Sequence, residues 1–313
     1  MARLEHTVPA LAAAAMGLIL LGFVLPSWLL YLLTFALAKG IVVLSLLLLM
    51  RTGLVSFGHG LYYALAAYAA GLAANYAGIT DAFVLLALGI VTAAAMAALL
   101  GLLLARYREI FFAMLSLAFS MILYGILVKT QALGSTDGFG MPRPTFAGWA
   151  PSADAARHVM FTLTVAAAFV TMLLLHHYLQ AGLGWVGEAI RENEIRVEYL
   201  GISARAVVHL NCVISGALAG MGGVLSALTS GHIDPEMAYW TTSGEFVFVT
   251  LLAGTGHVAA PFVGAFLFEL LRTYAFEYAP YTWQMILGAA MLLVILFMPR
   301  GLWSLFQVRL AVR

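Results

Sequence analysis

The chain has 313 residues, of which 64% are hydrophobic and only 9% are charged, and its formal net charge is +1. Soluble domains carry about 45–50% apolar and about 25% charged residues, so this chain has too little polar surface for a soluble protein of its size. The balanced charge excludes a basic nucleic-acid-binding surface. The single cysteine excludes an intrachain disulfide and a cysteine-clustered metal site. The composition therefore indicates a membrane protein.

Apolar runs long enough to cross a bilayer follow one another along the chain. A transmembrane helix needs about 20 mainly apolar residues. Such runs occur at 8–26, 28–50, 57–77, 82–105, 110–129, 159–179 and 207–229, followed by a longer apolar region at 243–275 and a last run at 282–298. We expect the first run to be retained, because Leu25, Pro26 and Ser27 do not form a convincing signal-peptidase site. Residues 1–313 are predicted to form one all-α polytopic membrane domain.

The region 243–275 is predicted to contain a break. Gly254, Gly256 and Pro261 interrupt it, which favours two short segments at 244–254 and 259–275 joined by irregular backbone inside the membrane. Two ordinary short helices with a tight turn are the alternative. With two segments here, the chain contains about ten transmembrane segments, including Gly-broken short ones of the kind found in transporters.

The distribution of Lys and Arg predicts the orientation. With the N-terminus in the cytoplasm, ten basic residues fall inside and four fall outside, which satisfies the positive-inside rule. The inner set is Arg3, Arg51, Arg106, Arg108, Arg191, Arg196, Arg205, Arg300, Arg309 and Arg313, and the outer set is Lys129, Arg143, Arg157 and Arg272. Both termini and the loop 182–206 are therefore expected to be cytoplasmic, and the region 243–275 must cross an even number of times.

The loop 182–206 contains four acidic and three basic residues in a chain that otherwise avoids charge. Its charges recur at i,i+3 and i,i+4 spacing, which stabilises an exposed helix by about 0.2–0.5 kcal/mol per pair. We expect one helix over 186–200. This helix is either a solvated connector or a docking helix that inserts into a groove on a cytoplasmic partner. The candidate docking residues are Glu188, Ile190, Arg191, Glu192, Arg196 and Leu200, with the two apolar side chains in the groove and the charges at its rim.

A second group of candidates lies at the two glycine-interrupted segments. Ser56, Phe57, Gly58, His59, Glu245, Gly254 and Gly256 either line a translocation pathway or pack helices together. Lys39, Glu245 and Glu269 fall in apolar segments, where a charged group needs a partner or a water-filled cavity. The small-residue pairs Gly216/Gly220 and Ala219/Gly223 permit close helix packing.

The energy source must lie on another polypeptide if transport is driven by ATP. The chain has two lysines, Lys39 and Lys129, and neither belongs to a Gly-Lys-Ser/Thr phosphate-binding core. No arrangement of side chains indicates catalysis or a metal site, so we expect a protein that is not an enzyme and needs no cofactor. The alternative is a stand-alone secondary transporter of a small polar or amphipathic solute, which would concentrate its ionisable residues at the midplane of the membrane.

Several segments, in order along the chain, resemble the LivM-type permease family of branched-chain amino-acid ABC transporters. They are GLVSFGHGLYYALAAYAAGL (53–72), GSTDGFGMP (134–142), EAIRENEIRVEYLGIS (188–203), VISGALAGMGGVLSAL (213–228), SGEFVFVTLLAGTGHVAAPFVGAFLFELL (243–271) and PRGL (299–302). Ala253 departs from the family, which usually has glycine there, and so does His257, where a less polar residue is common.

This resemblance implies a subunit of an importer in the bacterial inner membrane. It further implies a second homologous permease subunit, two ATP-binding subunits that drive transport, and a periplasmic binding protein that delivers branched-chain or related hydrophobic amino acids. The loop 182–206 would then couple the permease to the ATPase. Relatives of this design carry urea, short amides or aromatic acids, so the resemblance does not decide which of these classes is transported.

Overall fold

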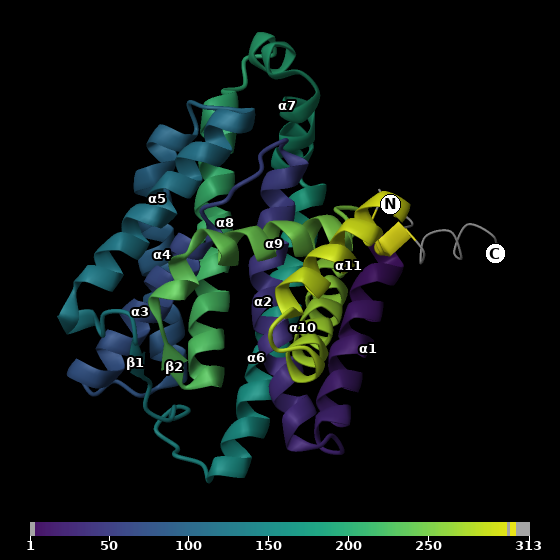
Figure 1. Cartoon of the computed structure of the whole chain (residues 1–313). Helices are drawn as coiled ribbons and strands as arrows, with labels where there is room; N and C mark the ends of the chain where they lie inside the picture. Colours follow the sequence, from purple (N-terminus) through teal and green to yellow (C-terminus); the bar gives the residue numbers. More distant parts are fainter. Residues whose placement is uncertain (1–3, 299–300, 305–313) are drawn as a thin grey trace.

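The computed structural model describes residues 4–298 and 301–304, and most of them lie in helices (Figure 1). The helices are α1 (Leu4–Gly22), α2 (Ser27–Arg51), α3 (His59–Tyr76), α4 (Ala82–Leu104), α5 (Glu109–Lys129), α6 (Ala153–Gln180), α7 (Gly182–Tyr199), α8 (Ala204–Ser230), α9 (Trp240–Ala253), α10 (Ala260–Tyr278) and α11 (Trp283–Phe297). Two short strands, β1 (Phe139–Gly140) and β2 (His232–Ile233), and two 3₁₀ turns (Gln131–Leu133 and Pro235–Ala238) complete the described fold. The prediction of an all-α fold is confirmed.

The predicted apolar runs correspond to helices, with small shifts at their ends. The first run was predicted to reach residue 26, but α1 ends at Gly22 because Pro26 starts the next helix from its N-cap position. Among the described residues, five helices are long and apolar enough to cross a membrane: α2, α4, α5, α6 and α8. The remaining helices are shorter or more polar.

Helix α2 lies at the centre of the bundle. It contacts α6, α8, α9 and α10, and residues 36–50 are buried without interruption. An apolar helix that lacks a polar face is stable only when other helices surround it, or when lipid does. By contrast, α4 and α5 lie at the periphery, where they leave large apolar side chains exposed: Leu99, Leu102, Phe111, Met114 and Ile122. This arrangement suits a protein surrounded by lipid.

Small residues bring α8 close to its neighbours. A Cβ atom added to Gly216 would overlap Ala97, and one added to Gly220 would overlap Ala93, both on α4. On another side of α8, a Cβ atom at Gly223 would overlap the backbone carbonyl of Tyr63 in α3. The predicted close packing through small residues is therefore confirmed, and α8 joins α3 and α4 to the central helix α2.

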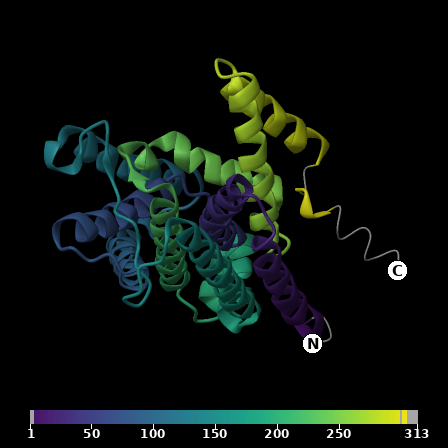
Figure 2. The same cartoon turned by 90° about the horizontal axis from the view of Figure 1, so that it is seen from below.

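The two ends of the bundle differ in structure. At one end, β1 pairs with β2 in antiparallel register, so the connection between α5 and α6 is tied to the segment after α8. The Met141 amide adds a hydrogen bond to the Gly231 carbonyl at 2.8 Å. At the opposite end, α7 projects beyond the other helices (Figure 1). A view from below shows the β1–β2 end, with the long helices seen along their axes (Figure 2).

The break predicted inside 243–275 is present. Helix α9 ends at Ala253 and α10 begins at Ala260, close to the predicted boundaries. Figure 1 shows α9 running across the bundle, whereas α10 runs along it. Gly254 ends α9 with φ of 85°, a conformation that favours glycine because it has no Cβ. The chain therefore changes direction sharply at this position.

Candidate coupling loop and membrane-embedded breaks

Helix α7 consists of two pieces and not of the single helix predicted over 186–200. Asn193 has φ of −162° and ψ of 100°, which is extended backbone between two helical segments. Its side-chain oxygen accepts a hydrogen bond from the Arg196 amide at 2.9 Å. Asparagine is a preferred N-cap residue because its side chain satisfies a free amide of the first helical turn. Asn193 thus starts a second short helix, and α8 begins at Ala204, slightly before the predicted end of the loop at 206.

Each piece of α7 is held by its own ion pair to another part of the chain. Before the kink, Glu188 accepts a hydrogen bond from Arg51 Nη1 at 3.2 Å. After the kink, Glu194 accepts two hydrogen bonds from Arg108, at 2.8 Å from Nε and 2.7 Å from Nη2. The spacing of the charges in the sequence predicts pairs within one helix, but both carboxylates pair with other parts of the chain. Glu194 was not among the candidate residues, and the structure makes it the acceptor of a bidentate contact from Arg108.

The apolar residues of α7 divide into a buried and an exposed set. Ile190 and Val197 are buried in a cluster with Leu54, Leu104 and Val208. Ile190 was predicted to fill a partner's groove, but it anchors α7 to this chain's own helices instead.

At the tip of the loop, Ile195, Tyr199 and Leu200 are 66%, 87% and 76% exposed. Ile195 and Tyr199 were missed in the sequence, although their i,i+4 spacing places them on one helical face. We call Ile195, Tyr199 and Leu200 the apolar tip.

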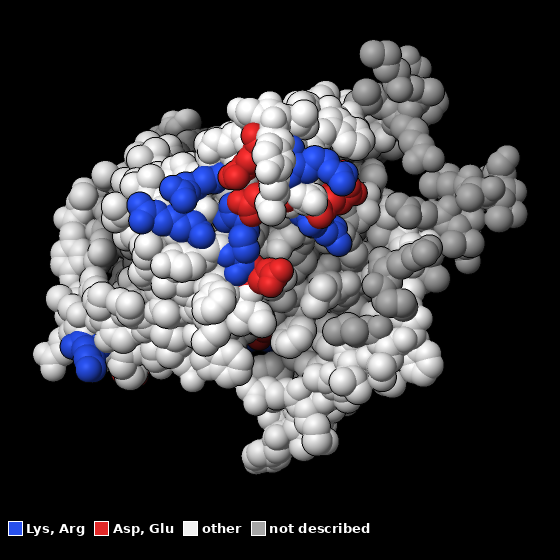
Figure 3. Space-filling view, turned by 90° about the horizontal axis from the view of Figure 1, so that it is seen from above, with Lys and Arg blue, Asp and Glu red and all other residues white. Residues whose placement is uncertain are grey.

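Charged side chains gather around the apolar tip. Viewed from the α7 end, the surface shows most of its visible Lys, Arg, Asp and Glu over this loop, and the rest of this face is largely uncharged (Figure 3). Three of the predicted rim residues, Arg191, Glu192 and Arg196, are exposed. The tip is thus an apolar patch with a charged border, which is the usual make-up of a protein–protein contact.

The first break, between α2 and α3, is hydrogen-bonded to two hydroxyl groups, one from α5 and one from the break itself. The Phe57 amide donates to Ser116 Oγ at 3.1 Å, and the Gly58 amide donates to Ser56 Oγ at 3.2 Å. A Cβ atom at Gly58 would lie 2.7 Å from the carbonyl oxygen of Ser116. Ser56 and Gly58 are buried, whereas Phe57 is partly exposed. Irregular backbone in a membrane protein is expected in such protein-lined surroundings.

His59 begins α3 and is fully buried. Its Nε2 atom lies 2.7 Å from Ser215 Oγ on α8. Ser215 in turn donates its hydroxyl hydrogen to the Ser45 carbonyl at 2.9 Å. The hydroxyl has no second hydrogen to donate, so His59 Nε2 is protonated and donates to Ser215 Oγ. This chain of hydrogen bonds connects α3, α8 and α2. It gives His59 a packing role, and its role in a pathway remains a prediction.

The second break, between α9 and α10, contacts the end of α2. The Thr255 carbonyl accepts a hydrogen bond from Arg51 Nε at 3.0 Å. Gly254 is buried and Gly256 is exposed. The His257 ring stacks on Trp303 with 4.7 Å between centroids, so the Gly301–Ser304 segment covers the break. Pro299 and Arg300 of the PRGL motif lie outside the described residues.

Two acidic and two basic residues form a cluster between α2, α9 and α10. Lys39 Nζ donates to Glu269 Oε1 at 2.6 Å and lies 3.7 Å from Glu245 Oε2. Arg272 Nη1 lies 3.3 Å from Glu245 Oε2 and 4.0 Å from Glu269 Oε1. The prediction that Lys39, Glu245 and Glu269 need partners is confirmed. Lys39 pairs with both carboxylates, and Arg272 is the fourth member of the cluster. The adjoining cavity of about 10 Å³ has room for about one water molecule.

Comparison with known proteins identifies the family. Residues 28–296 match the family described as "Branched-chain amino acid transport system / permease component". The chain belongs to this family of permeases. The permease is 29% identical over 284 residues to the "High-affinity branched-chain amino acid transport system permease protein LivM" of Escherichia coli (strain K12), and equally so to that of Salmonella typhimurium (strain LT2). These matches cover 84% of the permease and 66% of each relative, just under two thirds of their length. No solved structure matches it.

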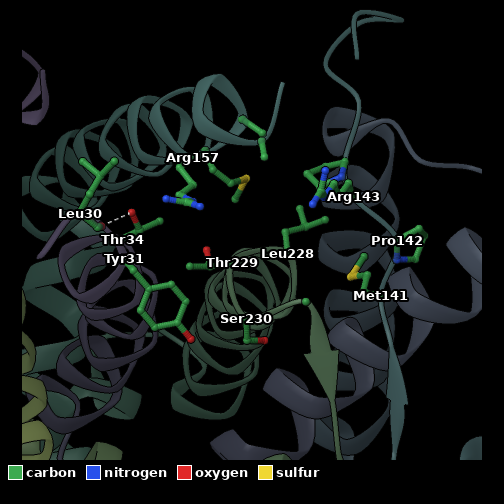
Figure 4. Close-up of a pocket in the computed structure, with 15 residues that line it drawn as sticks. Leu30, Tyr31, Thr34, Met141, Pro142, Arg143, Arg157, Leu228, Thr229 and Ser230 are labelled. Atoms are coloured by element: carbon green, nitrogen blue, oxygen red, sulfur yellow. Dashed lines mark hydrogen bonds between the residues drawn. The ribbon is translucent and has the colours of Figure 1, made fainter. Parts of the chain in front are cut away.

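The family and the apolar helices together make this chain a multi-pass membrane protein and a transport component. At the β1–β2 end, the permease contains a cavity of about 240 Å³ that sequence analysis did not predict. Arg143, from the loop after β1, and Arg157, from α6, lie on it together with Tyr31 of α2 (Figure 4). No sequence motif connects these positions, because they come from three separate segments.

Proposed function

We propose that this permease is one membrane subunit of an ABC importer of branched-chain or related hydrophobic amino acids in the bacterial inner membrane. Its partners would be a second homologous permease subunit, two ATP-binding subunits and a periplasmic binding protein. The family and the name of the two relatives support the transported class. The curated relatives are longer than the matched region, so the complete transport activity is part of the proposal.

The apolar tip of α7 is the observation that carries the proposal. The sequence offers no phosphate-binding loop, so movement driven by ATP must enter through a surface of the permease. The tip presents exposed Ile195, Tyr199 and Leu200 within a charged border. Aromatic and aliphatic anchors surrounded by polar groups are characteristic of binding hot spots. We assign docking of the ATP-binding subunit to this tip, with Arg191, Glu192 and Arg196 at its rim.

The translocation pathway is proposed to pass the two breaks. Of the candidate residues, Phe57 and Glu245 are partly exposed and Gly256 is exposed, so a second permease subunit can reach them. The other four candidates are buried and would pack behind the residues that line the pathway: Ser56, Gly58, His59 and Gly254. The backbone at the breaks is not helical, so it can offer polar contacts in an otherwise apolar protein. The self-paired cluster around Lys39 has no room for a solute, which disfavours the alternative of a stand-alone secondary transporter.

The proposed topology has about ten membrane segments, α1–α6 and α8–α11, of which the short α9 runs across the bundle, with both termini and the α7 end in the cytoplasm. Arg51, Arg106, Arg108, Arg191, Arg196 and Arg205 belong to the α7 end, whereas Lys129, Arg143 and Arg157 belong to the β1–β2 end. Arg3, Arg300, Arg309 and Arg313, which also served to predict the orientation, lie outside the described residues. Arg272 belongs to the ion cluster and not to a loop.

Cysteine labelling tests this topology. Glu198→Cys in α7 and Thr136→Cys in the loop before β1 both introduce a thiol at an exposed position, whereas the native Cys212 is buried. A thiol reagent that cannot cross the membrane is expected to label only Thr136→Cys in intact cells, and both variants after the membrane is opened. Labelling of Glu198→Cys in intact cells would contradict the proposed orientation.

The function is tested by isolating the complex. Affinity purification of the tagged permease is expected to recover a second permease and an ATP-binding subunit. Vesicles with the complete set are expected to take up leucine only when its binding protein and ATP are present. Leucine uptake by the permease alone, driven by an ion gradient, would overturn the proposal in favour of a secondary transporter.

A further inference from the structure

The end of α2 contacts both the coupling loop and the second break. Arg51 is the last residue of α2, and its guanidinium group makes two hydrogen bonds in different directions. Nη1 donates to Glu188 Oε1 in α7 at 3.2 Å, and Nε donates to the Thr255 carbonyl at 3.0 Å. One planar group thus connects α7 with the break between α9 and α10, which lie far apart in the sequence.

The next residue, Thr52, is hydrogen-bonded to α8 and packs closely against α7. Thr52 Oγ1 accepts a hydrogen bond from Asn211 Nδ2 at 2.9 Å, and Asn211 Oδ1 accepts one from the Tyr178 hydroxyl at 2.6 Å. A Cβ atom at Gly187 of α7 would lie 3.1 Å from Thr52 Oγ1. This close packing couples displacement of the first piece of α7 to the end of α2.

The break contains two glycines. Thr255 stands between Gly254 and Gly256, and Gly254 has φ of 85°. Glycines permit backbone rotation that other residues resist. The Thr255 carbonyl therefore lies between two residues of permissive backbone, and Arg51 holds it by a hydrogen bond.

We propose that Arg51 is a positioning residue that transmits movement of the coupling loop to the α9–α10 break. This inference rests on the proposed function, because it assumes that an ATP-binding subunit moves α7. The guanidinium group is rigid and planar, so Glu188 cannot shift without pulling Thr255 or breaking a hydrogen bond. Lysine has a single ammonium group on a flexible stem and cannot hold both acceptors in this fixed geometry.

A second arginine provides a matched control. Arg108 makes a similar contact with Glu194, beyond the kink at Asn193. Its remaining hydrogen bonds go to the carbonyls of Ala105 and Tyr107, both in the connection between α4 and α5. Arg108 thus holds the same loop without touching the α9–α10 break.

The experiment uses the complete importer in lipid vesicles, with Thr255→Cys as a reporter that keeps the backbone carbonyl. The rate of thiol labelling is measured with and without ATP plus vanadate, together with leucine uptake per ATP hydrolysed. We expect the nucleotide-dependent change in labelling rate to fall by roughly five-fold or more in Arg51→Gln and Arg51→Lys, as loss of a coupling contact predicts. Leucine uptake per ATP hydrolysed is expected to fall in the same two variants. Arg108→Lys is expected to retain the labelling change.

The amount of ATP-binding subunit that binds the permease distinguishes failure of the proposed function from failure of the inference about Arg51. If that subunit does not bind the unaltered permease, the proposed function fails. If it binds but labelling at Thr255→Cys does not respond to nucleotide, or responds equally in the Arg51 variants, the inference about Arg51 is wrong. An equal loss in Arg108→Lys would also contradict it, because the effect would then follow from loosening the loop.

Discussion

Replacing Lys39 by methionine is expected to destabilise the folded permease by about 3–5 kcal/mol, the usual effect of breaking a buried ion pair. The side chains of Lys39 and Glu269 are each only 8% exposed and lie 2.6 Å apart. Without Lys39, two carboxylates share the single positive charge of Arg272. The contact between α2 and α10 should then loosen. The measurement is the midpoint of thermal unfolding of the purified permease in detergent.

The double variant Lys39→Met/Glu269→Gln is the control for this prediction. It removes one charge of each sign and leaves the Arg272–Glu245 contact in place. Exchanging a whole buried pair for neutral residues is often close to neutral for stability. We therefore expect the double variant to recover most of the loss. An unchanged midpoint in the single variant would show that the cluster does not stabilise the fold.

Tyr199→Asp and Leu200→Asp are each expected to weaken binding of the ATP-binding subunit by roughly 30-fold or more, which corresponds to loss of a hot-spot residue of about 2 kcal/mol. Both side chains are largely exposed in the isolated permease, at 87% and 76%. The substitution therefore introduces a charge into the proposed contact without disturbing this chain's own core. Binding is measured by titrating the labelled ATP-binding subunit onto the permease in lipid nanodiscs.

Tyr281→Asp makes the same chemical change at an exposed tyrosine in the turn between α10 and α11. It is expected to leave this binding unchanged. Ile190→Asp does not serve the same purpose, because Ile190 is buried and its substitution would disturb the packing of α7. If both tip variants bind as tightly as the unaltered permease, α7 is a connector and the docking surface lies elsewhere.

The helices could be predicted because their signal is local. Long apolar runs indicate α2, α4, α5 and α8 directly, and the glycines around 254 and 256 mark the break between α9 and α10. The small residues of α8 also indicated its close packing. Each of these features depends on composition and spacing within one segment, which a single sequence displays in full.

The partners of charged residues could not be predicted, because they depend on the fold. The apolar residues around Lys39 indicate that it needs a partner, but nothing near residue 39 indicates that Glu269 supplies it. For α7, regular spacing of charges favoured one helix with internal pairs. The observed pairs instead join α7 to Arg51 and Arg108, whose guanidinium groups also donate hydrogen bonds to carbonyls of the α9–α10 break and of the α4–α5 connection. The signal for the kink at Asn193 was present, since asparagine favours N-caps, but the charge pattern outweighed it.

The contact between Lys39 and Glu269 has a consequence for biosynthesis. The two residues are 230 positions apart, so the lysine enters the membrane long before its acid is made. At the usual synthesis rate of about 5–20 residues per second, the interval is roughly 10–50 s. During that time α2 must keep its ammonium group near water or the headgroups, as long basic side chains do in lipid. We therefore expect the central helix of the bundle to take its final depth after α10 has been inserted, so that assembly of the N-terminal half is completed only with the C-terminal half.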